Sequence, residues 1–447
     1  VSGVHKGMIA ARAILTFLAQ SGVYEAPFRE PTAEETLILE YMNRFRADPS
    51  AEADLIAPPD RKDLGVDWKM FRDEMKALKP KPPLVFNLEL LDAARKHSHY
   101  MTLHGLGHDE VPGRPGFTGA SPGDRMKAAG YKGFGAAENA FRDSGGPWHS
   151  HWGFVVDHGE GPGGMQPGRG HRRNMIGDFR EVGPGAVPHG KDRLSVTHNF
   201  GSRDLRMAGG VVYIDLNGNA FYDVGEGLGG VQVSAGGDAS VLTWRSGAYS
   251  LDLKGRGPVT LVAVLDGERF TRTFPAGTDN VKFDWIVPVD VPLRKADRWL
   301  EAVEKAGPAG TPKHRTALVN LYHHTRELYL DADRKARVAE LTGEVGAELD
   351  RSRKAVLDAL GDVEQAGLQK LLDEQRKPWK GTEAEAWFAD AEVLARLKRG
   401  VTAFLRQPKV ADRDRRQMAA ALEDAQRRMK TGAFKAEIDG LISKVRS

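Results

Sequence analysis

The chain has 447 residues, which is long for one domain and predicts about three domains at ~150 residues each. Lys and Arg number 64 against 61 Asp and Glu, so the net charge of +3 does not favour nucleic acid or an anionic membrane surface as a partner. The chain has no cysteine, which excludes disulfides, a thiol nucleophile and cysteine metal sites. His, Asp, Glu and Asn are the candidate metal ligands that remain.

Residues 1–31 form a predicted leader. An apolar run from Met8 to Ala19 follows the basic Lys6 and precedes small residues, as in a signal peptide, although Arg12 interrupts it. Two interpretations stay open: a cleaved signal peptide, or an amphipathic or disordered leader. No other run approaches the ~20 apolar residues that a membrane span needs, so no transmembrane span is expected.

A helix is expected to begin just after the leader. Thr32 followed by Glu35 is a capping signal, and apolar residues at near-helical spacing follow it. The helix should end before Pro49. Residues 49–83 are rich in Pro, Asp and Lys and predict a long irregular connection.

Further helices are expected on either side of a glycine-rich loop. Asn87 caps a predicted helix that runs past Met101. Gly and Pro then dominate residues 105–123, and a short helix in the stretch DRMKAAGY should stop at Gly130.

A second glycine-rich stretch contains Gly159, Gly161 and Gly164 at the spacing of a dinucleotide-binding fingerprint. That fingerprint requires a strand before it and a helix that opens from its last glycine. No strand is predicted here and Pro162 lies inside the pattern, so we reject a dinucleotide site.

Ten of the 14 histidines lie between His97 and His198, together with the motifs GHDE, AEN and GHRRNMI. In this order, with PLVFNLELLDAARKHSHYM and DRMKAAGY, these motifs resemble the CAP superfamily. This superfamily comprises the SCP-like domains of cysteine-rich secretory and plant pathogenesis-related proteins. The resemblance covers residues 32–206, is strongest to bacterial members, and implies an α-β-α sandwich.

The resemblance also implies a central cleft with two histidines and two acids that can hold a divalent metal. On the matching motifs, the histidines are His108 and His171 and the first acid is Glu138. The fourth position departs from the family pattern, because this region offers Asp157, with Glu160 as a substitute.

Two chemical interpretations of this set remain open. Two neutral imidazoles with carboxylates suit Zn²⁺ or another divalent cation, and a carboxylate that is not a ligand could act as a general base. Alternatively, the histidines and acids only satisfy one another's hydrogen bonds. Six further histidines are expected outside the site: His97, His99, His104, His149, His151 and His158. The two amides next to site residues, Asn139 and Asn174, are expected to close backbone turns.

Residues 207–293 predict a small β-sandwich. Five oxygen-bearing side chains follow a β-run at positions 1, 3, 5, 9 and 12 of an EF-hand loop, a spacing that suits Ca²⁺: Asp215, Asn217, Asn219, Asp223 and Glu226. Ala220 replaces the turn glycine, and the predicted flanks are strands. This segment resembles the SdrD-B/Cna-B-like repeats of bacterial surface proteins, and the resemblance implies a calcium site. The alternative is a polar turn without metal.

Residues 294–447 are dense in Ala, Leu, Glu, Lys and Arg, with apolar stripes at helical spacing, and predict a helical domain of unknown role. The paired His323 and His324 are expected at its surface.

The sequence therefore predicts an α+β fold class: a CAP-type α-β-α sandwich, a small β-sandwich and an all-α domain. The leading hypothesis is a bacterial protein, secreted or in the cell envelope, that binds an extracellular ligand without catalysis. Its expected partner is a small apolar molecule, a peptide or a cell-surface component. One alternative is a metal-dependent, peptidase-like hydrolase with Glu138 or Asp157 as base, although no HExxH or GxSxG motif supports it. Another is a cell-surface adhesion protein that binds through its helical module.

Overall fold

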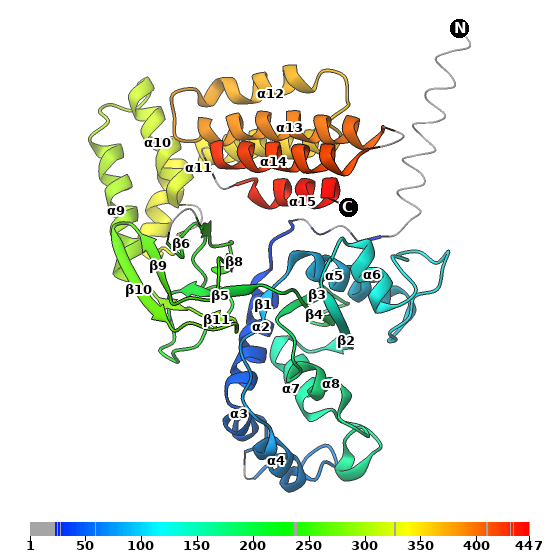
Figure 1. The fold of residues 1–447 in the computed structure, drawn as a ribbon. Helices are drawn as coiled ribbons and strands as arrows, with labels where there is room; N and C mark the ends of the chain where they lie inside the picture. Colours follow the sequence, from blue (N-terminus) through cyan, green and yellow to red (C-terminus); the bar gives the residue numbers. More distant parts are fainter. Residues whose placement is uncertain are drawn as a thin grey trace.

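A computed structural model describes residues 23–24, 26, 28–58, 60–236, 239–325, 328–407, 410–429, 431 and 433–446 (Figure 1). The predicted signal peptide, Met8–Ala19, lies outside the described residues. Along the chain, a mixed α/β part comes first, a sheet-rich part second and a helical part third, as the sequence predicts.

The first part contains one four-stranded sheet and the helices around it. Its elements in chain order are α2 (Ala33–Ala47), α3 (Pro49–Ile56), α4 (Trp68–Ala77), β1 (Val85–Phe86), α5 (Leu88–His104), α6 (Pro122–Ala128), β2 (Phe134–Ser144), α7 (Pro147–Val156), the 3₁₀ turn η1 (Pro162–Gly164), α8 (Gly170–Met175), β3 (Glu181–Pro188) and β4 (Leu194–Ser202). The strand order is β1-β3-β4-β2, with β1 parallel to β3 and the other pairs antiparallel.

Helices cover both faces of this sheet because β3 alternates between them. A Cβ at Gly183 or Gly185 would lie 2.1–2.3 Å from the backbone of α5, so only glycine permits this close approach. Val182 and Ala186, which flank these glycines and point to the opposite face of the sheet, belong to a core cluster with residues of α2 and α7. The α-β-α arrangement expected for this part is therefore present.

The expectation of an irregular connection over residues 49–83 is wrong, because it contains α3 and α4. Asp48 caps α3 through a bond from the Ala51 amide, and Pro49 takes the first helical position, where its missing N–H costs nothing. The proline thus starts a new helix directly after α2 ends. The predicted caps Thr32 and Asn87 are both confirmed.

The second part is built from two small sheets. Its strands are β5 (Arg206–Tyr213), β6 (Gln232–Ser234), β7 (Ser240–Leu242), β8 (Ala248–Leu253), β9 (Val259–Leu265), β10 (Glu268–Phe274), β11 (Val281–Lys282) and β12 (Trp285–Ile286). One sheet has the order β10-β9-β6-β7, and in the other β5 pairs with β8, β11 and β12. A core cluster that includes Val212, Val233 and Leu261 joins the two sheets.

The first two parts also share packing. Phe221, in the loop after β5, stacks on Tyr41 of α2 at 5.4 Å between ring centroids, and the Arg44 guanidinium lies 4.6 Å from the Phe221 ring. Lys282 of β11 contacts Glu40 of α2 at 2.7 Å. The loop predicted to hold calcium therefore packs directly on α2.

The third part is helical throughout. It contains α9 (Asp290–Glu304), α10 (Pro312–Thr325), α11 (Ala332–Leu360), α12 (Leu368–Arg376), the 3₁₀ turn η2 (Lys377–Trp379), α13 (Glu385–Leu405), α14 (Asp412–Arg428) and α15 (Lys435–Arg446). Trp379, Phe388 and Phe434 lie in its main core, and the layered helices α12 to α15 stand above the other parts in Figure 1.

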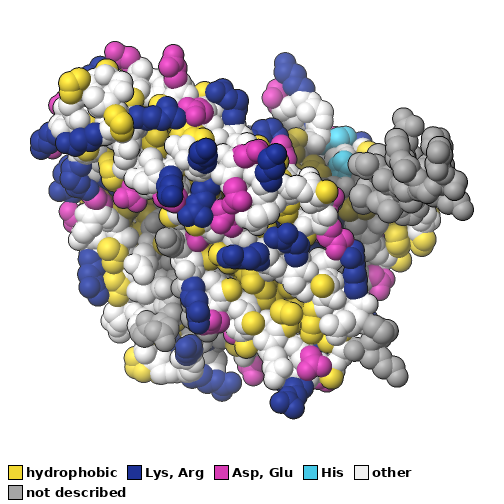
Figure 2. Space-filling view, turned by 90° about the horizontal axis from the view of Figure 1, so that it is seen from above, with side chains coloured by type: hydrophobic (Ala, Val, Ile, Leu, Met, Phe, Trp, Pro, Cys, Tyr) yellow, Lys and Arg dark blue, Asp and Glu magenta, His cyan; other side chains and the backbone are white. Residues whose placement is uncertain are grey.

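None of the helices in the described residues has the length and apolar character needed to cross a bilayer. The face seen in Figure 2 mixes Lys and Arg with Asp and Glu side chains, which agrees with the small net charge of +3.

Candidate functional site

The first histidine–acid pair joins the GHDE loop to strand β2. His108 Nδ1 lies 3.0 Å from Glu138 Oε1, and the His108 side chain is 51% exposed while that of Glu138 is 1% exposed. The hydrogen bond to Glu138 raises the pKa of His108 above its ordinary value and outweighs the opposite effect of partial burial. Glu138 therefore holds an imidazole that faces solvent.

Glu138 is also the centre of a buried ionic network. Its Oε2 accepts from Arg125 Nη2 of α6 at 2.7 Å, and His97 Nε2 of α5 lies 3.6 Å from its Oε1. The ring of His97 in turn binds Glu110 at 3.0 Å and the Gly107 carbonyl at 2.9 Å. Burial would raise the pKa of Glu110, but hydrogen bonds from His97 and Thr118 lower it below its ordinary value.

The second pair joins the end of α7 to α8. His171 Nδ1 lies 2.7 Å from Asp157 Oδ1, and the His171 amide donates to Asp157 Oδ2 at 3.0 Å. Asp157 is buried and adopts a left-handed backbone (φ 58°), which Asp tolerates better than most residues. Asp157 therefore contacts His171, whereas Glu160 is exposed.

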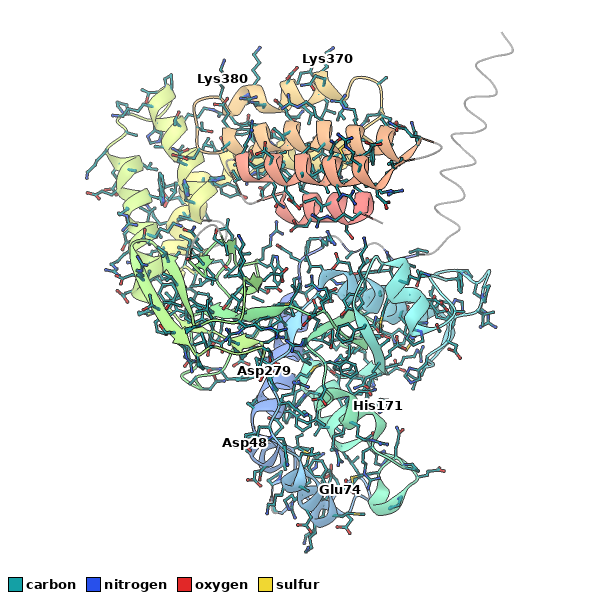
Figure 3. The ribbon with its side chains drawn as sticks, viewed as in Figure 1. Asp48, Glu74, His171, Asp279, Lys370 and Lys380 are labelled. Carbon is teal, nitrogen blue, oxygen red and sulfur yellow. The ribbon has the colours of Figure 1, made fainter. Side chains whose placement is uncertain are left out.

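Helix α4 anchors the short helix that carries His171. Glu74 of α4 binds Arg169 at 2.8 Å and Arg172 at 2.5 Å, and Arg172 also donates to the carbonyls of α7. Figure 3 labels Glu74 and His171 in the same lower part of the molecule. The missed helix α4 therefore helps to position a predicted site residue.

Two asparagines connect the histidine–acid pairs. Asn139 Nδ2 donates to the His171 carbonyl at 3.1 Å, and Asn174 Nδ2 donates to Asn139 Oδ1 at 2.9 Å. The sequence had assigned both amides to backbone turns. In the described residues no group of three or more His, Asp or Glu side chains is arranged to hold a metal ion. The predicted residues thus form two linked pairs, in which each acid binds the Nδ1 of its histidine.

His97 and Arg125 were missed by the sequence reasoning, although both contact Glu138. The available signal was the stretch DRMKAAGY, which places an arginine on a short helix between two acid-bearing motifs. A buried carboxylate needs a partner of opposite charge, and Arg125 is fully buried beside it.

The comparisons with known proteins bear on this part of the chain. Residues 39–200 match the sequence model of CAP, described as the cysteine-rich secretory protein family. This segment is a CAP domain.

A solved structure with some similarity is an extracellular protein containing an SCP domain from Bacillus anthracis strain Ames, at 21% identity and a TM-score of 0.22. The match covers 31% of this chain and 39% of that protein, so the chain spans about two fifths of its length. No curated protein matches the chain. The family match ends at residue 200, so the resemblance of residues 207–293 to SdrD-B/Cna-B-like repeats stays a prediction.

The predicted calcium loop of the second part is closed by its own side chains. Asp215 accepts from the amides of Gly218, Asn219 and Ala220, while Asp223 Oδ2 accepts from the side-chain amides of Asn217 and Asn219. Glu226 accepts from the amides of Leu216 and Asp223. Ala220 takes a left-handed backbone (φ 55°) at the position where an EF-hand has glycine.

One histidine of the CAP domain, His198, is buried and has no hydrogen-bond partner for its ring among the described residues. Neither ring nitrogen of His198 on β4 forms a hydrogen bond, and the ring lies 4.6 Å from that of Phe154, which in turn lies 5.2 Å from His171. Burial lowers the pKa of His198 to about 3, with smaller contributions from His151 and His171.

This burial predicts an acid-dependent loss of stability. Above its ordinary pKa of about 6.5, His198 is neutral in both the folded and the unfolded chain, and the fold keeps its full stability. As the pH falls from 6.5 towards 3, only the unfolded chain binds a proton at this residue, so the free energy of unfolding decreases. At about pH 5 the loss should be about 2 kcal/mol, from 1.36 kcal/mol per pKa unit.

Urea unfolding at about pH 7.5 and pH 5 tests this prediction. The change in unfolding free energy between the two pH values should be smaller in His198→Phe than in wild type by about 2 kcal/mol. In the half-buried control His314→Phe it should equal that of wild type. An identical pH dependence in wild type and His198→Phe would contradict it.

Proposed function

We propose that the CAP domain is an extracellular, non-catalytic binding domain whose contact groups are the rings of His108 and His171. The observation that supports this most is that the acids beside both rings are already occupied. Glu138 accepts from Arg125 and His108, and Asp157 accepts twice from His171. No carboxylate of these pairs is free to act as a general base.

The same contacts weigh against the hydrolase alternative. A peptidase-like reaction needs a base that takes a proton from water, and Glu138 and Asp157 were the candidates. Both are buried and hydrogen-bonded, so each orients an imidazole. We therefore assign the acids a positioning role.

A divalent cation such as Zn²⁺ is a second candidate for this site. Metal-binding histidines commonly donate their other ring N–H to a carboxylate, which fixes the tautomer and raises the basicity of the ligating nitrogen. Both Nδ1 atoms meet carboxylates here, so Nε2 of His108 and of His171 would hold the ion and the acids would lie behind them. A bound ion would act as a Lewis acid or a bridge to a ligand.

We also propose that Asp215, Asn217, Asn219, Asp223 and Glu226 bind Ca²⁺. All five side chains take part in the hydrogen bonds of one loop, and Ala220 adopts the turn conformation that the EF-hand spacing requires. Because Phe221 of this loop stacks on Tyr41, calcium would stabilise the packing between the second part and the CAP domain.

We infer that the whole chain acts outside the cytoplasm, secreted or in the cell envelope, as the CAP family does. A small apolar molecule, a peptide or a cell-surface component remains the proposed partner. Adhesion through the helical third part is the alternative, and binding by a fragment of residues 290–446 alone would favour it.

Zn²⁺ titration by calorimetry tests the two-histidine site. Wild type should bind one ion, and His108→Ala and His171→Ala should each lose it. Asp157→Asn, which suits the left-handed backbone, should weaken binding by about 10–100-fold because it removes only the orienting carboxylate. Affinity should be lower at about pH 5 than at pH 7.5, since only neutral imidazole binds a metal and the pKa of His108 is raised.

The control is His314→Ala in the third part, which should bind as wild type does. An absence of binding in wild type, or an equal loss in the control, would count against the metal. Turnover of a peptide by wild type that Glu138→Gln abolishes would replace the binding proposal with the hydrolase.

Thermal unfolding with and without Ca²⁺ tests the loop. Calcium at about 100 times its dissociation constant should stabilise wild type by about 2.7 kcal/mol. Asp215→Asn and Glu226→Gln keep the side-chain shape and should remove this shift, whereas Asp54→Asn, an exposed acid on α3, should keep it. A calcium shift that survives in both loop variants would place the ion elsewhere.

A further inference from the structure

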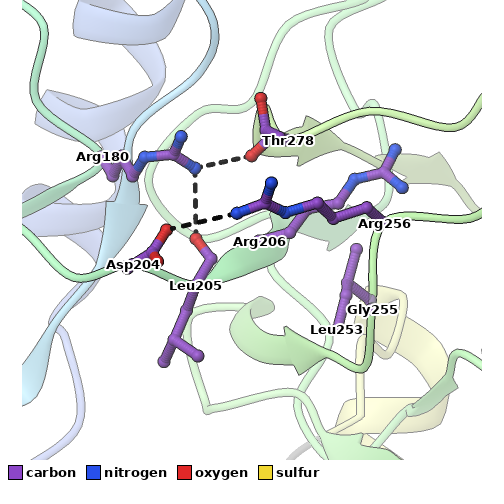
Figure 4. Close-up of a pocket in the computed structure, with 8 residues that line it drawn as sticks. All are labelled: Arg180, Asp204, Leu205, Arg206, Leu253, Gly255, Arg256 and Thr278. Atoms are coloured by element: carbon purple, nitrogen blue, oxygen red, sulfur yellow. Dashed lines mark hydrogen bonds and ion pairs between the residues drawn. The ribbon is translucent and has the colours of Figure 1, made fainter.

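A small pocket lies where the CAP domain meets the second part, away from the two-histidine site. It has a volume of about 110 Å³ and is lined by Arg180, Asp204, Leu205, Arg206, Leu253, Gly255, Arg256 and Thr278. Figure 4 shows the Arg180 and Arg256 side chains extending toward each other from opposite sides of it. Two cations that face each other across one pocket are an unfavourable arrangement unless an anion lies between them.

Arg180 is held in place while part of its guanidinium stays unused. Its Nη1 donates to the carbonyls of Leu205 and Thr278, and its backbone is fixed by bonds to Val85, Gly201 and Asn280. Within the described residues no hydrogen bond engages its Nε or Nη2 and no carboxylate pairs with it. This side chain is therefore positioned with donors to spare.

Arg256 has only a weak counter-charge in the pocket. Its one ion pair within the described part of the chain is to Asp204 at 3.8 Å, and the two side chains are 71% and 85% exposed. A pair this long and this exposed contributes little. The guanidinium of Arg256 can therefore turn to another acceptor at small cost.

The balance of charge in the pocket is positive. Arg206 is buried, and its Nε, Nη1 and Nη2 donate to the carbonyls of Asp279, Gly257 and Pro275. Those carbonyls satisfy its hydrogen bonds but do not cancel its charge. Three arginines thus meet one exposed carboxylate, and Asp279 forms no ion pair with them among the described residues.

We propose that this pocket binds a phosphate or sulfate group. Arginine pairs with such oxyanions through two parallel N–H bonds, and two guanidiniums on opposite sides supply donors to a tetrahedral group. The volume of the pocket suits a group as small as one oxyanion, because drug-sized ligands need ~300–1,000 Å³ and this pocket has about 110 Å³. The group is either a free ion or the end of a larger phosphorylated or sulfated molecule.

The position of the pocket gives the oxyanion a structural consequence. Arg180 belongs to the CAP domain, whereas Arg256 and Thr278 belong to the second part. An anion held between them joins the two parts and stabilises the chain by mass action.

The test is calorimetric titration and thermal unfolding of the full chain with sodium phosphate and sodium sulfate, against sodium chloride at equal ionic strength. Wild type should bind both oxyanions and unfold at a higher temperature in them. Arg256→Gln changes an exposed residue, so it should fold and should bind about tenfold more weakly, as loss of a charge-assisted bond implies. Arg180→Gln should weaken binding in the same way.

The matched control is Arg269→Gln, which removes the same charge from an exposed position at the other end of the β9–β10 hairpin. It should bind as wild type does. Equal effects of oxyanions and chloride on wild type, or an equal loss in the control, would overturn the proposal. Phenyl phosphate distinguishes the two sources: binding equal to that of inorganic phosphate supports the end of a larger molecule, and much weaker binding supports a free ion.

Discussion

The CAP domain depends on a buried set of four ionisable side chains around Glu138. Two carboxylates, Glu110 and Glu138, lie with Arg125 and His97, and all four side chains are essentially inaccessible to water. Both nitrogens of His97 lie within hydrogen-bonding distance of oxygen atoms, one of Glu110 and one of the Gly107 carbonyl. Each buried carboxylate thus lies beside nitrogen groups, and buried carboxylates need such partners.

This set ties together α5, the GHDE loop, α6 and β2, and so decides where His108 lies. The loop is rich in glycine and has little core of its own. Its position comes from Glu110, which accepts from Thr118, and from Arg125, which donates to the His108 carbonyl at 2.8 Å. The partly exposed ring of His108 is therefore positioned by buried side chains, Glu138 and Arg125.

Much of this could be predicted from the sequence, because caps and motifs are local signals. Thr32, Asn87 and Gly130 mark helix ends by their own chemistry, and the motifs GHDE, AEN and GHRRNMI name three of the four paired residues. What could not be predicted depends on contacts between distant segments. The pairing of Arg125 with Glu138 requires the loop to close, and α4 was missed although Phe71 and Met75 lie at helical spacing.

The role of the two acids is the clearest example of such a distant contact. A motif gives Glu138 and Asp157 as acids near histidines but does not say whether each faces a ligand or a ring nitrogen. In the structure each acid faces a ring nitrogen: Glu138 lies 3.0 Å from Nδ1 of His108, and Asp157 lies 2.7 Å from Nδ1 of His171. Asp157 makes its contact from the end of α7, where its backbone is left-handed, and no motif in the sequence specifies that conformation.

The central claim is that carboxylates hold both histidines through Nδ1 and leave Nε2 for a ligand. Nitrogen-15 NMR of the imidazole rings measures directly which ring nitrogens carry a proton. The account predicts a proton on Nδ1 of both His108 and His171, where each ring meets its carboxylate. A ring of either histidine with a proton on Nε2 and none on Nδ1 would contradict it.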